Sequence, residues 1–379
     1  MIQKEKGVEY MKKRILAMAV FLVMLISVAP AAAVNADALS HTGLEGKTLS
    51  ILGDSISTYS GISNNASIQQ GLAGGYVFYK PGTLGVWQKD TWWQQTADAL
   101  GLRLLVNNSW SGSCMLMEGG GVAGAFRERC IQLHTNGGEE QDIIAIYLGT
   151  NDQEYFPDTL GTAEEIDFSA LIQPGEDGFT YAEPVTCMEA YAIALHKIQQ
   201  RYPQAEVYCF TLVQRPFSNP FSMLVFNVQL KYLTEHFGVN LVDLAWCGIH
   251  CGRQTFDLQM GDYVHPAPAG MDAIAGSFVS AILSSSRYVA EGTVLHKVSC
   301  DLKNVVRLHS GGDRAVHGNS LQMELLTLPG YSELEVVVTM GGADITDSCY
   351  AEGVIRIPEV TGDVQIRAYA SVPETVVPS

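Results

Sequence analysis

A serine at the end of an apolar run, Ser55, stands where this 379-residue chain could do covalent chemistry. Residues 47–52 predict a buried strand, and Gly53-Asp54-Ser55 ends it. In open α/β sheets, ligands bind beyond the carboxyl ends of the strands. Ser55 is therefore a candidate nucleophile, provided that the chain also supplies a base, a carboxylate that orients it, and donors for an oxyanion.

A histidine and an aspartate within residues 262–265 are the candidate base and its partner. An imidazole can accept the serine proton near neutral pH, which suits His265 to that role. Asp262 precedes it by three residues and could accept the other ring N–H, which would hold the required tautomer. With Ser55, these two residues point to nucleophilic attack on a carbonyl group.

Two more polar stretches are candidates for binding the oxyanion that such an attack creates. Residues 107–112 and 149–152 each follow a predicted strand, so they should meet Ser55 at one edge of the sheet. The backbone N–H groups of Ser55 and Gly112 and the side-chain amide of Asn151 are three possible donors. Losing one such donor typically lowers the rate by roughly 100- to 1,000-fold.

Each motif alone also has an ordinary structural interpretation. Glycine, aspartate and serine are common turn residues, Asn151-Asp152 could cap a helix, and His265 could be a loop residue. All four stretches together, in this order, favour the catalytic interpretation. Asp54 is interpreted as holding the turn, and Asp152 as a cap or loop anchor rather than a catalytic acid.

The four stretches resemble the four sequence blocks of the SGNH hydrolases, also called GDSL-type esterases, over about residues 45–287. Ile56 replaces the leucine of the eponymous motif, which is a conservative change. The resemblance implies a three-layer α/β/α, flavodoxin-like fold and hydrolysis of esters without a metal or other cofactor. It also implies the following roles: Ser55 as nucleophile, Asp262 and His265 as the rest of a catalytic triad, and Ser55, Gly112 and Asn151 as oxyanion donors.

The order of predicted elements is that of a doubly wound α/β domain with a parallel sheet. Apolar runs predict strands at residues 47–52, 103–106, 142–148, 206–212 and 240–244. Helical spacing and end signals predict helices at residues 92–100, 186–201, 221–237 and 268–283. Two long polar stretches, 56–86 and 153–180, are expected to form the rim of the site.

Short β-rich runs separated by glycine turns begin after residue 290 and predict a small antiparallel β-sandwich, residues 296–372, behind a linker at 284–292. This stretch resembles a module of secreted proteins of gut Firmicutes. It is expected either to bind glycan, cell wall or another protein, or to be a spacer. Cys300 and Cys349 are a possible disulfide pair within it.

Charge and the N-terminal sequence indicate where the protein works. The net charge of −17 makes nucleic acid and anionic membrane surfaces poor partners. Residues 1–36 read as a signal peptide: a basic start, an apolar run at 15–28, and small residues before Ala33 and Ala36. That run is shorter than the roughly 20 residues needed to span a bilayer, so cleavage and secretion are favoured over a membrane anchor.

The expected substrate is an O-acetyl ester of a carbohydrate, small or polymeric. Aromatic residues near the predicted site, Tyr59, Trp87 and Trp110, are candidate substrate contacts. A lipase, phospholipase or thioesterase is the alternative among enzymes. A non-catalytic surface protein that binds glycan is the alternative of another class.

Overall fold

The computed structural model describes residues 42–62, 76–176, 178–215 and 220–372. The predicted signal peptide and the middle of the 56–86 stretch lie outside these ranges. Among the described residues, no helix combines the length and apolarity that a membrane crossing requires.

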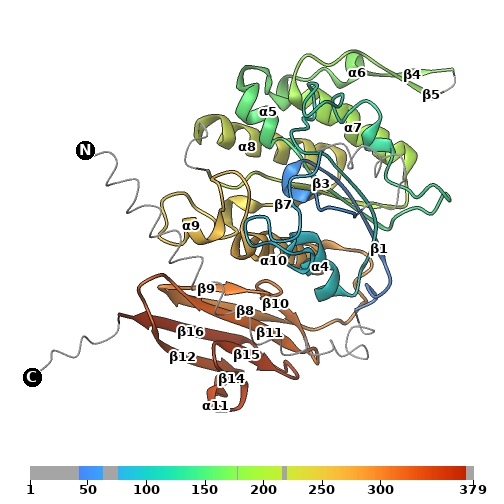
Figure 1. Cartoon of the computed structure of the whole chain (residues 1–379). Helices are drawn as coiled ribbons and strands as arrows, with labels where there is room; N and C mark the ends of the chain where they lie inside the picture. Colours follow the sequence, from blue (N-terminus) through green and yellow to red (C-terminus); the bar gives the residue numbers. More distant parts are fainter. Residues whose placement is uncertain (1–41, 63–75, 177, 216–219, 373–379) are drawn as a thin grey trace, which may run out of the picture.

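A five-stranded parallel sheet forms the centre of the larger unit, as predicted (Figure 1). Its spatial order is β2-β1-β3-β6-β7, and every neighbouring pair is parallel. All five residues of the middle strand β3 are fully buried, which is why this stretch is apolar without alternation. The bounds are β1 Thr48–Gly53, β2 Arg103–Ser109, β3 Ile143–Tyr147, β6 Glu206–Phe210 and β7 Asn240–Val242.

Helices cover both faces of this sheet and complete the three layers. Helices α7 and α8 lie on one face, and α4 and α10 pack together on the other (Figure 1). Thr91 caps α4 by accepting from the N–H of Gln94, and Gly101 ends that helix in the left-handed conformation. The bounds are α4 Trp92–Leu100, α5 Thr150–Tyr155, α7 Cys187–Arg201, α8 Pro220–Phe237, α9 Phe256–Gln259 and α10 Pro268–Ser285.

The stretch at 153–180 is more regular than predicted. It contains the short helix α6, Phe168–Leu171, and a hairpin of β4, Ile172–Gly175, with β5, Gly178–Tyr181. This hairpin projects away from the body of the sheet (Figure 1). Its residues are mostly exposed, so the buried apolar pattern that would predict strands is missing.

The C-terminal unit is a β-sandwich, but it is not purely antiparallel. One sheet has the order β10-β8-β16-β12-β13 and the other β14-β15-β11-β9. Strand β8 pairs with β16 in parallel, which contradicts the prediction of an antiparallel sandwich. The bounds are β8 Leu295–Lys303, β9 Val305–Leu308, β10 Arg314–Val316, β11 Leu321–Thr327, β12 Glu333–Met340, β13 Ala343–Asp344, β14 Tyr350–Ala351, β15 Val354–Ile357 and β16 Val364–Ser371, with one short helix, α11 Thr346–Cys349.

Two further details concern the strands and the cysteines of this unit. The β-rich stretch 302–308 is divided between β8 and β9, because Asn304 adopts a left-handed conformation (φ 58°) and turns the chain. Cys300 and Cys349 are free thiols, so the proposed disulfide is wrong. The Cys300 sulfur instead accepts a hydrogen bond from Arg307.

Candidate active site

The polar stretches leave the sheet at one level because of the strand register. Gly53 at the end of β1 pairs with Ser109 of β2 on one side and with Tyr147 of β3 on the other. A side chain at position 53 would lie within 2.7 Å of Ser109 Oγ and Ser57 Oγ, so only glycine fits here. The chain then turns immediately into a short 3-10 helix that begins with Ser55.

The structure brings Ser55, His265 and Asp262 into one hydrogen-bonded row. Ser55 Oγ lies 2.9 Å from His265 Nε2, across 210 positions of sequence. His265 Nδ1 lies 2.8 Å from Asp262 Oδ2. In this order the hydroxyl can donate to the imidazole while the carboxylate accepts from the other ring nitrogen, which is the arrangement that activates a serine.

Asp262 is held as an anion by the loop that it begins. Burial alone would raise its pKa, but hydrogen bonds from the His265 ring and from the backbone N–H groups of His265 and Val264 outweigh it, so the pKa lies below the usual value. Oδ1 is 2.7 Å from the His265 nitrogen and 3.1 Å from that of Val264. The carboxylate therefore fixes both the backbone and the ring of His265.

The loop between α9 and α10 is tightly closed. The Gly261 N–H donates to the His265 carbonyl at 2.9 Å, and Met260 and Pro266 form a β-bridge. Tyr263 between them has a left-handed backbone (φ 69°), which is uncommon for an aromatic residue and marks local strain. The buried Tyr79 hydroxyl donates to the Pro266 carbonyl at 2.7 Å and ties the loop to the rim.

Two of the candidate oxyanion donors follow neighbouring strands: Gly112 lies in the turn after β2, and Asn151 lies in the first turn of α5, after β3. Gly112 has a left-handed backbone (φ 78°), and no acceptor among the described residues takes its N–H. The Asn151 side chain is buried, and one of its amide hydrogens goes to the Ser113 carbonyl at 2.8 Å. That bond holds the amide at the Gly112 loop and leaves its second hydrogen for a ligand.

Comparison with known proteins identifies the family of this chain. Residues 47–282 match the model of the GDSL-like lipase/acylhydrolase family, which is more than half of the chain. The chain belongs to the GDSL-like lipase/acylhydrolase family. This acylhydrolase is therefore an enzyme that hydrolyses carboxylic esters, and the parallel sheet with its flanking helices is the fold of that family.

Solved structures resemble the larger unit of this acylhydrolase. A Bacteroides ovatus protein described as a GDSL-like lipase is 22% identical, with 64% of this chain and 100% of that chain covered and a TM-score of 0.44. A Bacteroides uniformis protein with the same description is 23% identical, with 63% and 97% covered and a TM-score of 0.44. A carbohydrate esterase family 3 structure from Talaromyces cellulolyticus is 15% identical, with 61% and 94% covered and a TM-score of 0.36. No curated protein matches the chain.

Buried charged residues hold the loops of the site. Asp152 accepts from the backbone N–H groups of Met115 and Leu116, which confirms its interpretation as a loop anchor. The buried Arg129 guanidinium donates to the carbonyls of Gly53 and Asn108 at 2.7 and 2.8 Å. Burial lowers the pKa of Arg129 to about 9. Sequence reasoning missed this arginine because nothing local distinguishes it from a surface arginine.

Asp54 holds the turn, as interpreted from the sequence. Its Oδ1 accepts from the Ile56 N–H at 2.9 Å, and the side chain is fully buried. Burial raises its pKa to about 6, and the Ile56 hydrogen bond and the neighbouring His265 only partly offset that effect. The ionised form of Asp54 is thus a cost to the folded state near neutral pH.

Asp54→Asn is expected to raise the free energy of unfolding by about 2–3 kcal/mol at pH 8 and to change it little near pH 4. The folded pKa of about 6 lies above the ordinary 3.8. The wild-type protein therefore loses stability as pH rises from about 4 to about 6, and an uncharged asparagine does not. Denaturant unfolding at both pH values measures this. The exposed Asp158→Asn is the control, and an equal effect of Asp54→Asn at both pH values would contradict the explanation.

Phe78 is a neighbour of the site that the sequence did not single out. Its ring stacks on the His265 imidazole, with centroids 3.4 Å apart and planes 10° apart. Phe78 belongs to the long stretch 56–86. The residue pattern there is not periodic, so it does not predict which side chains face the site. The ring covers one face of the imidazole and limits its rotation.

Phe78→Ala is expected to lower kcat by about 10-fold, because an imidazole that is free to rotate spends less time aligned with Ser55. Phe78→Leu keeps a bulky apolar side chain and should lose less. Steady-state hydrolysis of p-nitrophenyl acetate measures both. Equal kcat for Phe78→Ala and the wild type would show that the ring does not orient His265.

The three predicted substrate contacts differ in their surroundings. Tyr59 is only 5% exposed and belongs to the main core, so it offers no open ring face to a sugar. Trp87 is 48% exposed. Trp110 is partly buried, donates from its indole to Asn108 Oδ1, and has its ring 4.9 Å from that of Tyr76. Of the three, Trp87 and Trp110 have a ring surface that a substrate could contact, and Tyr59 does not.

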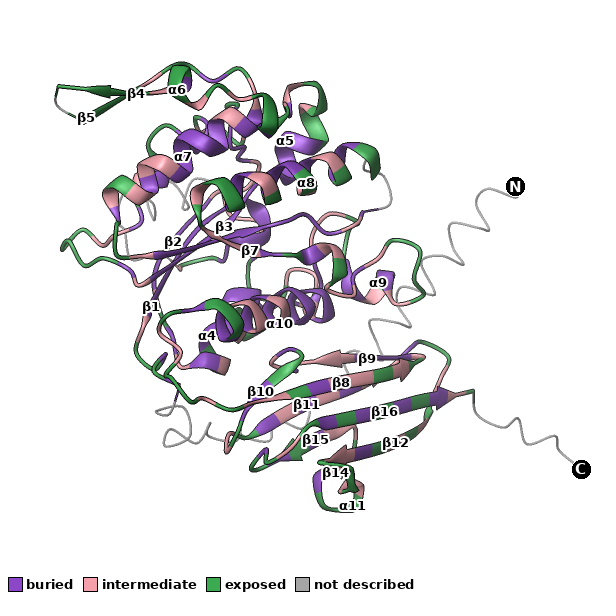
Figure 2. Cartoon of the chain, turned by 180° about the vertical axis from the view of Figure 1, so that it is seen from behind, coloured by how far each residue is buried: buried purple, intermediate pink, exposed green. Residues whose placement is uncertain are grey.

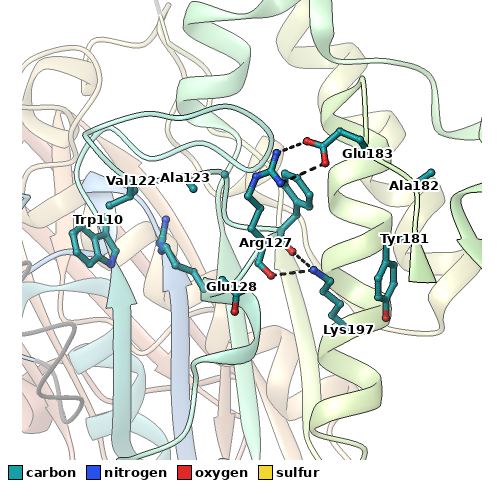
Figure 3. A pocket seen from close by; sticks show the side chains of 12 residues that line it. Trp110, Val122, Ala123, Arg127, Glu128, Tyr181, Ala182, Glu183 and Lys197 are labelled. Atoms are coloured by element: carbon teal, nitrogen blue, oxygen red, sulfur yellow. Dashed lines mark hydrogen bonds and ion pairs between the residues drawn. The ribbon is translucent and has the colours of Figure 1, made fainter. Parts of the chain in front are cut away.

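Trp110 also lines a cavity of about 450 Å³ (Figure 3). Trp110 lies at one end of this cavity, and Tyr181 and Lys197 lie at the other. Arg127 forms an ion pair with Glu183 across it, and Lys197 donates to backbone carbonyls. The lining includes neither Ser55 nor His265, so this cavity is separate from the space in front of the proposed nucleophile.

Proposed function

We propose that this acylhydrolase is a secreted serine esterase that removes short acyl groups, most of all O-acetyl groups, from carbohydrate. The observation that carries the proposal is the hydrogen-bonded row of Ser55, His265 and Asp262 at the carboxyl edge of the sheet. Gly112, in the turn after β2, and Asn151, in the first turn of α5, are the proposed oxyanion donors, with the N–H of Ser55. No metal or other cofactor takes part in the proposed steps.

The proposed mechanism is a double displacement. Ser55 Oγ attacks the ester carbonyl while His265 Nε2 takes the hydroxyl proton, and Asp262 stabilises the imidazolium. The tetrahedral oxyanion collapses, the alcohol leaves with the proton from His265, and an acyl-enzyme remains. Water then attacks this ester with His265 again as base, which releases the carboxylic acid and restores Ser55.

The enclosure of the serine supports a small acyl group. Ser55 is 4% exposed, and Phe78 covers one face of His265 beside it. An acetyl group needs little space beyond the carbonyl, whereas a fatty acyl chain needs an extended apolar groove. Trp110 and Tyr76 lie close to the turn that contains Gly112, and their rings offer faces on which a sugar could stack.

Secretion rests on the sequence of residues 1–36 and belongs to the proposal. Sequencing the amino terminus of the protein recovered from culture medium tests it. Mature chains that begin after Ala33 or Ala36 would support the proposal. An uncleaved chain that stays with the cells would contradict it.

The substrate is tested by comparing esters of rising acyl length with acetylated polymers. The enzyme is expected to be fastest on p-nitrophenyl acetate, slower on the butyrate and nearly inactive on the octanoate. It should also release acetate from acetylated xylan or acetylated peptidoglycan, with the inactive Ser55→Ala chain as the blank. Highest activity on the octanoate would favour a lipase or thioesterase instead.

A further inference from the structure

The β-sandwich packs directly against the helix that follows His265 (Figure 2). Ala269 in the first turn of α10 forms a buried apolar cluster with Val306 of β9 and Leu328. Leu258 of α9 packs against the same cluster. Ala269 comes four residues after His265 and Leu258 four residues before Asp262, so both ends of the loop at 262–265 rest on the sandwich.

A buried carboxylate on α10 has partners from the sandwich. Asp272 is 1% exposed. Its Oδ1 accepts from the Ser310 N–H at 2.5 Å and its Oδ2 from the Ser310 hydroxyl at 2.9 Å. Arg307 Nε lies 3.7 Å from the same Oδ2. A charge buried in this way is costly without its partners, so an undocked sandwich would leave Asp272 unpaired in an apolar setting.

The two backbones also meet without room for a side chain between them. A Cβ added at Gly276 of α10 would lie 2.8 Å from Gly312 Cα, and one added at Gly312 would lie 2.6 Å from the Gly276 carbonyl oxygen. A further contact joins His309 to Asp90: His309 Nε2 and Asp90 Oδ1 are 3.3 Å apart. These contacts describe a fitted interface rather than a module held by a flexible linker.

We infer that the C-terminal β-sandwich is a positioning element of the active site, which holds α10 and the loop at 262–265 through Asp272 and the Gly276–Gly312 contact. The inference rests on the proposed roles of Asp262 and His265. The loop is short, and contacts of Gly261 and Pro266 close it. A displacement of α10 would therefore also displace His265. A displacement of about 1 Å at a reacting group can cost about 100-fold in rate.

Two variants of the full-length chain test this inference. Asp272→Ala removes the buried anchor, and kcat for p-nitrophenyl acetate should fall by 10-fold or more with KM within about twofold of the wild type. Gly276→Ala should lower kcat by about 3- to 10-fold in the same pattern. Alanine favours a helix more than glycine does, so this loss could not come from a weaker α10.

Asp347→Ala, at an exposed position on α11, which lies at the side of the sandwich away from α10 (Figure 1), is the matched control and should keep wild-type kcat. Circular dichroism and the thermal midpoint establish that each variant is folded. If Asp272→Ala does not fold, Gly276→Ala decides. Folded variants with wild-type kcat, or a change confined to KM, would overturn the inference. Activity retained by Ser55→Ala would instead overturn the proposed function itself.

Discussion

Ser55→Ala is expected to lower kcat for p-nitrophenyl acetate by about 10⁴-fold or more. Without Oγ there is no nucleophile 2.9 Å from His265 Nε2, and no acyl-enzyme can form. The oxyanion donors and substrate binding would remain, so a small residual rate above the uncatalysed reaction is expected. KM should change little, because a hydroxyl contributes far less to substrate binding than to the transition state.

Ser60→Ala is the matched control for this variant. Ser60 is an exposed serine five positions along the same segment, and its backbone N–H donates to the Tyr79 carbonyl. Its replacement should leave kcat within about twofold of the wild type. Wild-type turnover by Ser55→Ala would mean that another group attacks the ester.

Asp262→Asn is expected to lower kcat by about 10²- to 10⁴-fold at neutral pH. Asparagine can still accept the backbone N–H groups of Val264 and His265, so the loop should keep its shape. It carries no negative charge to stabilise the imidazolium, and its amide can hold the ring in the wrong tautomer. The Asp262 side chain is 40% exposed. Water near this position can therefore stabilise part of the imidazolium charge in the variant, which is why the expected loss of kcat extends down to about 10²-fold.

Asp257→Asn gives the comparison for Asp262→Asn. Asp257 is an exposed aspartate on α9, five positions before Asp262, and its replacement by asparagine removes the same charge. Steady-state kinetics and a thermal unfolding curve should be recorded for both. An Asp262→Asn enzyme with at least half of wild-type kcat would show that the carboxylate does not orient His265.

The parallel sheet and the pairing of Asp262 with His265 were predictable because their signals are local. Fully buried strands are continuous apolar runs, and a polar residue at the end of such a run lies at the sheet edge. Asp262 and His265 are three positions apart, so any tight loop brings them together. Ser55 and His265 meet across 210 positions, and only the family pattern indicated that contact before the structure showed its distance.

The parts that could not be predicted depend on contacts between distant surfaces. Phe78 reaches His265 from a long loop whose path no periodicity determines. Tyr59 resembles a rim residue in sequence, yet it packs into the core. Asp272 and Ser310 belong to two units that a linker separates in the sequence, and no sequence pattern in either unit predicts their contact.

The docked sandwich changes the expected behaviour of a truncated chain. A tethered module could be removed without effect on ester hydrolysis. Here its removal would expose Ala269 and Leu258 and leave Asp272 without Ser310 and Arg307. Binding of glycan, cell wall or another protein by residues 296–372 stays a prediction, and the shared interface is an independent reason for the two units to occur in one chain.

The central claim is that Ser55 is the nucleophile and His265 its base, and trapping the nucleophile tests it most directly. The wild-type enzyme is treated with a fluorophosphonate, which phosphonylates an activated serine, and the labelled peptide is identified by mass spectrometry. The account predicts one adduct per chain, on Ser55, with loss of esterase activity in parallel, and labelling that is much slower in His265→Ala. An active enzyme that takes up no label at Ser55, or that is inactivated by an adduct on another residue, would contradict it.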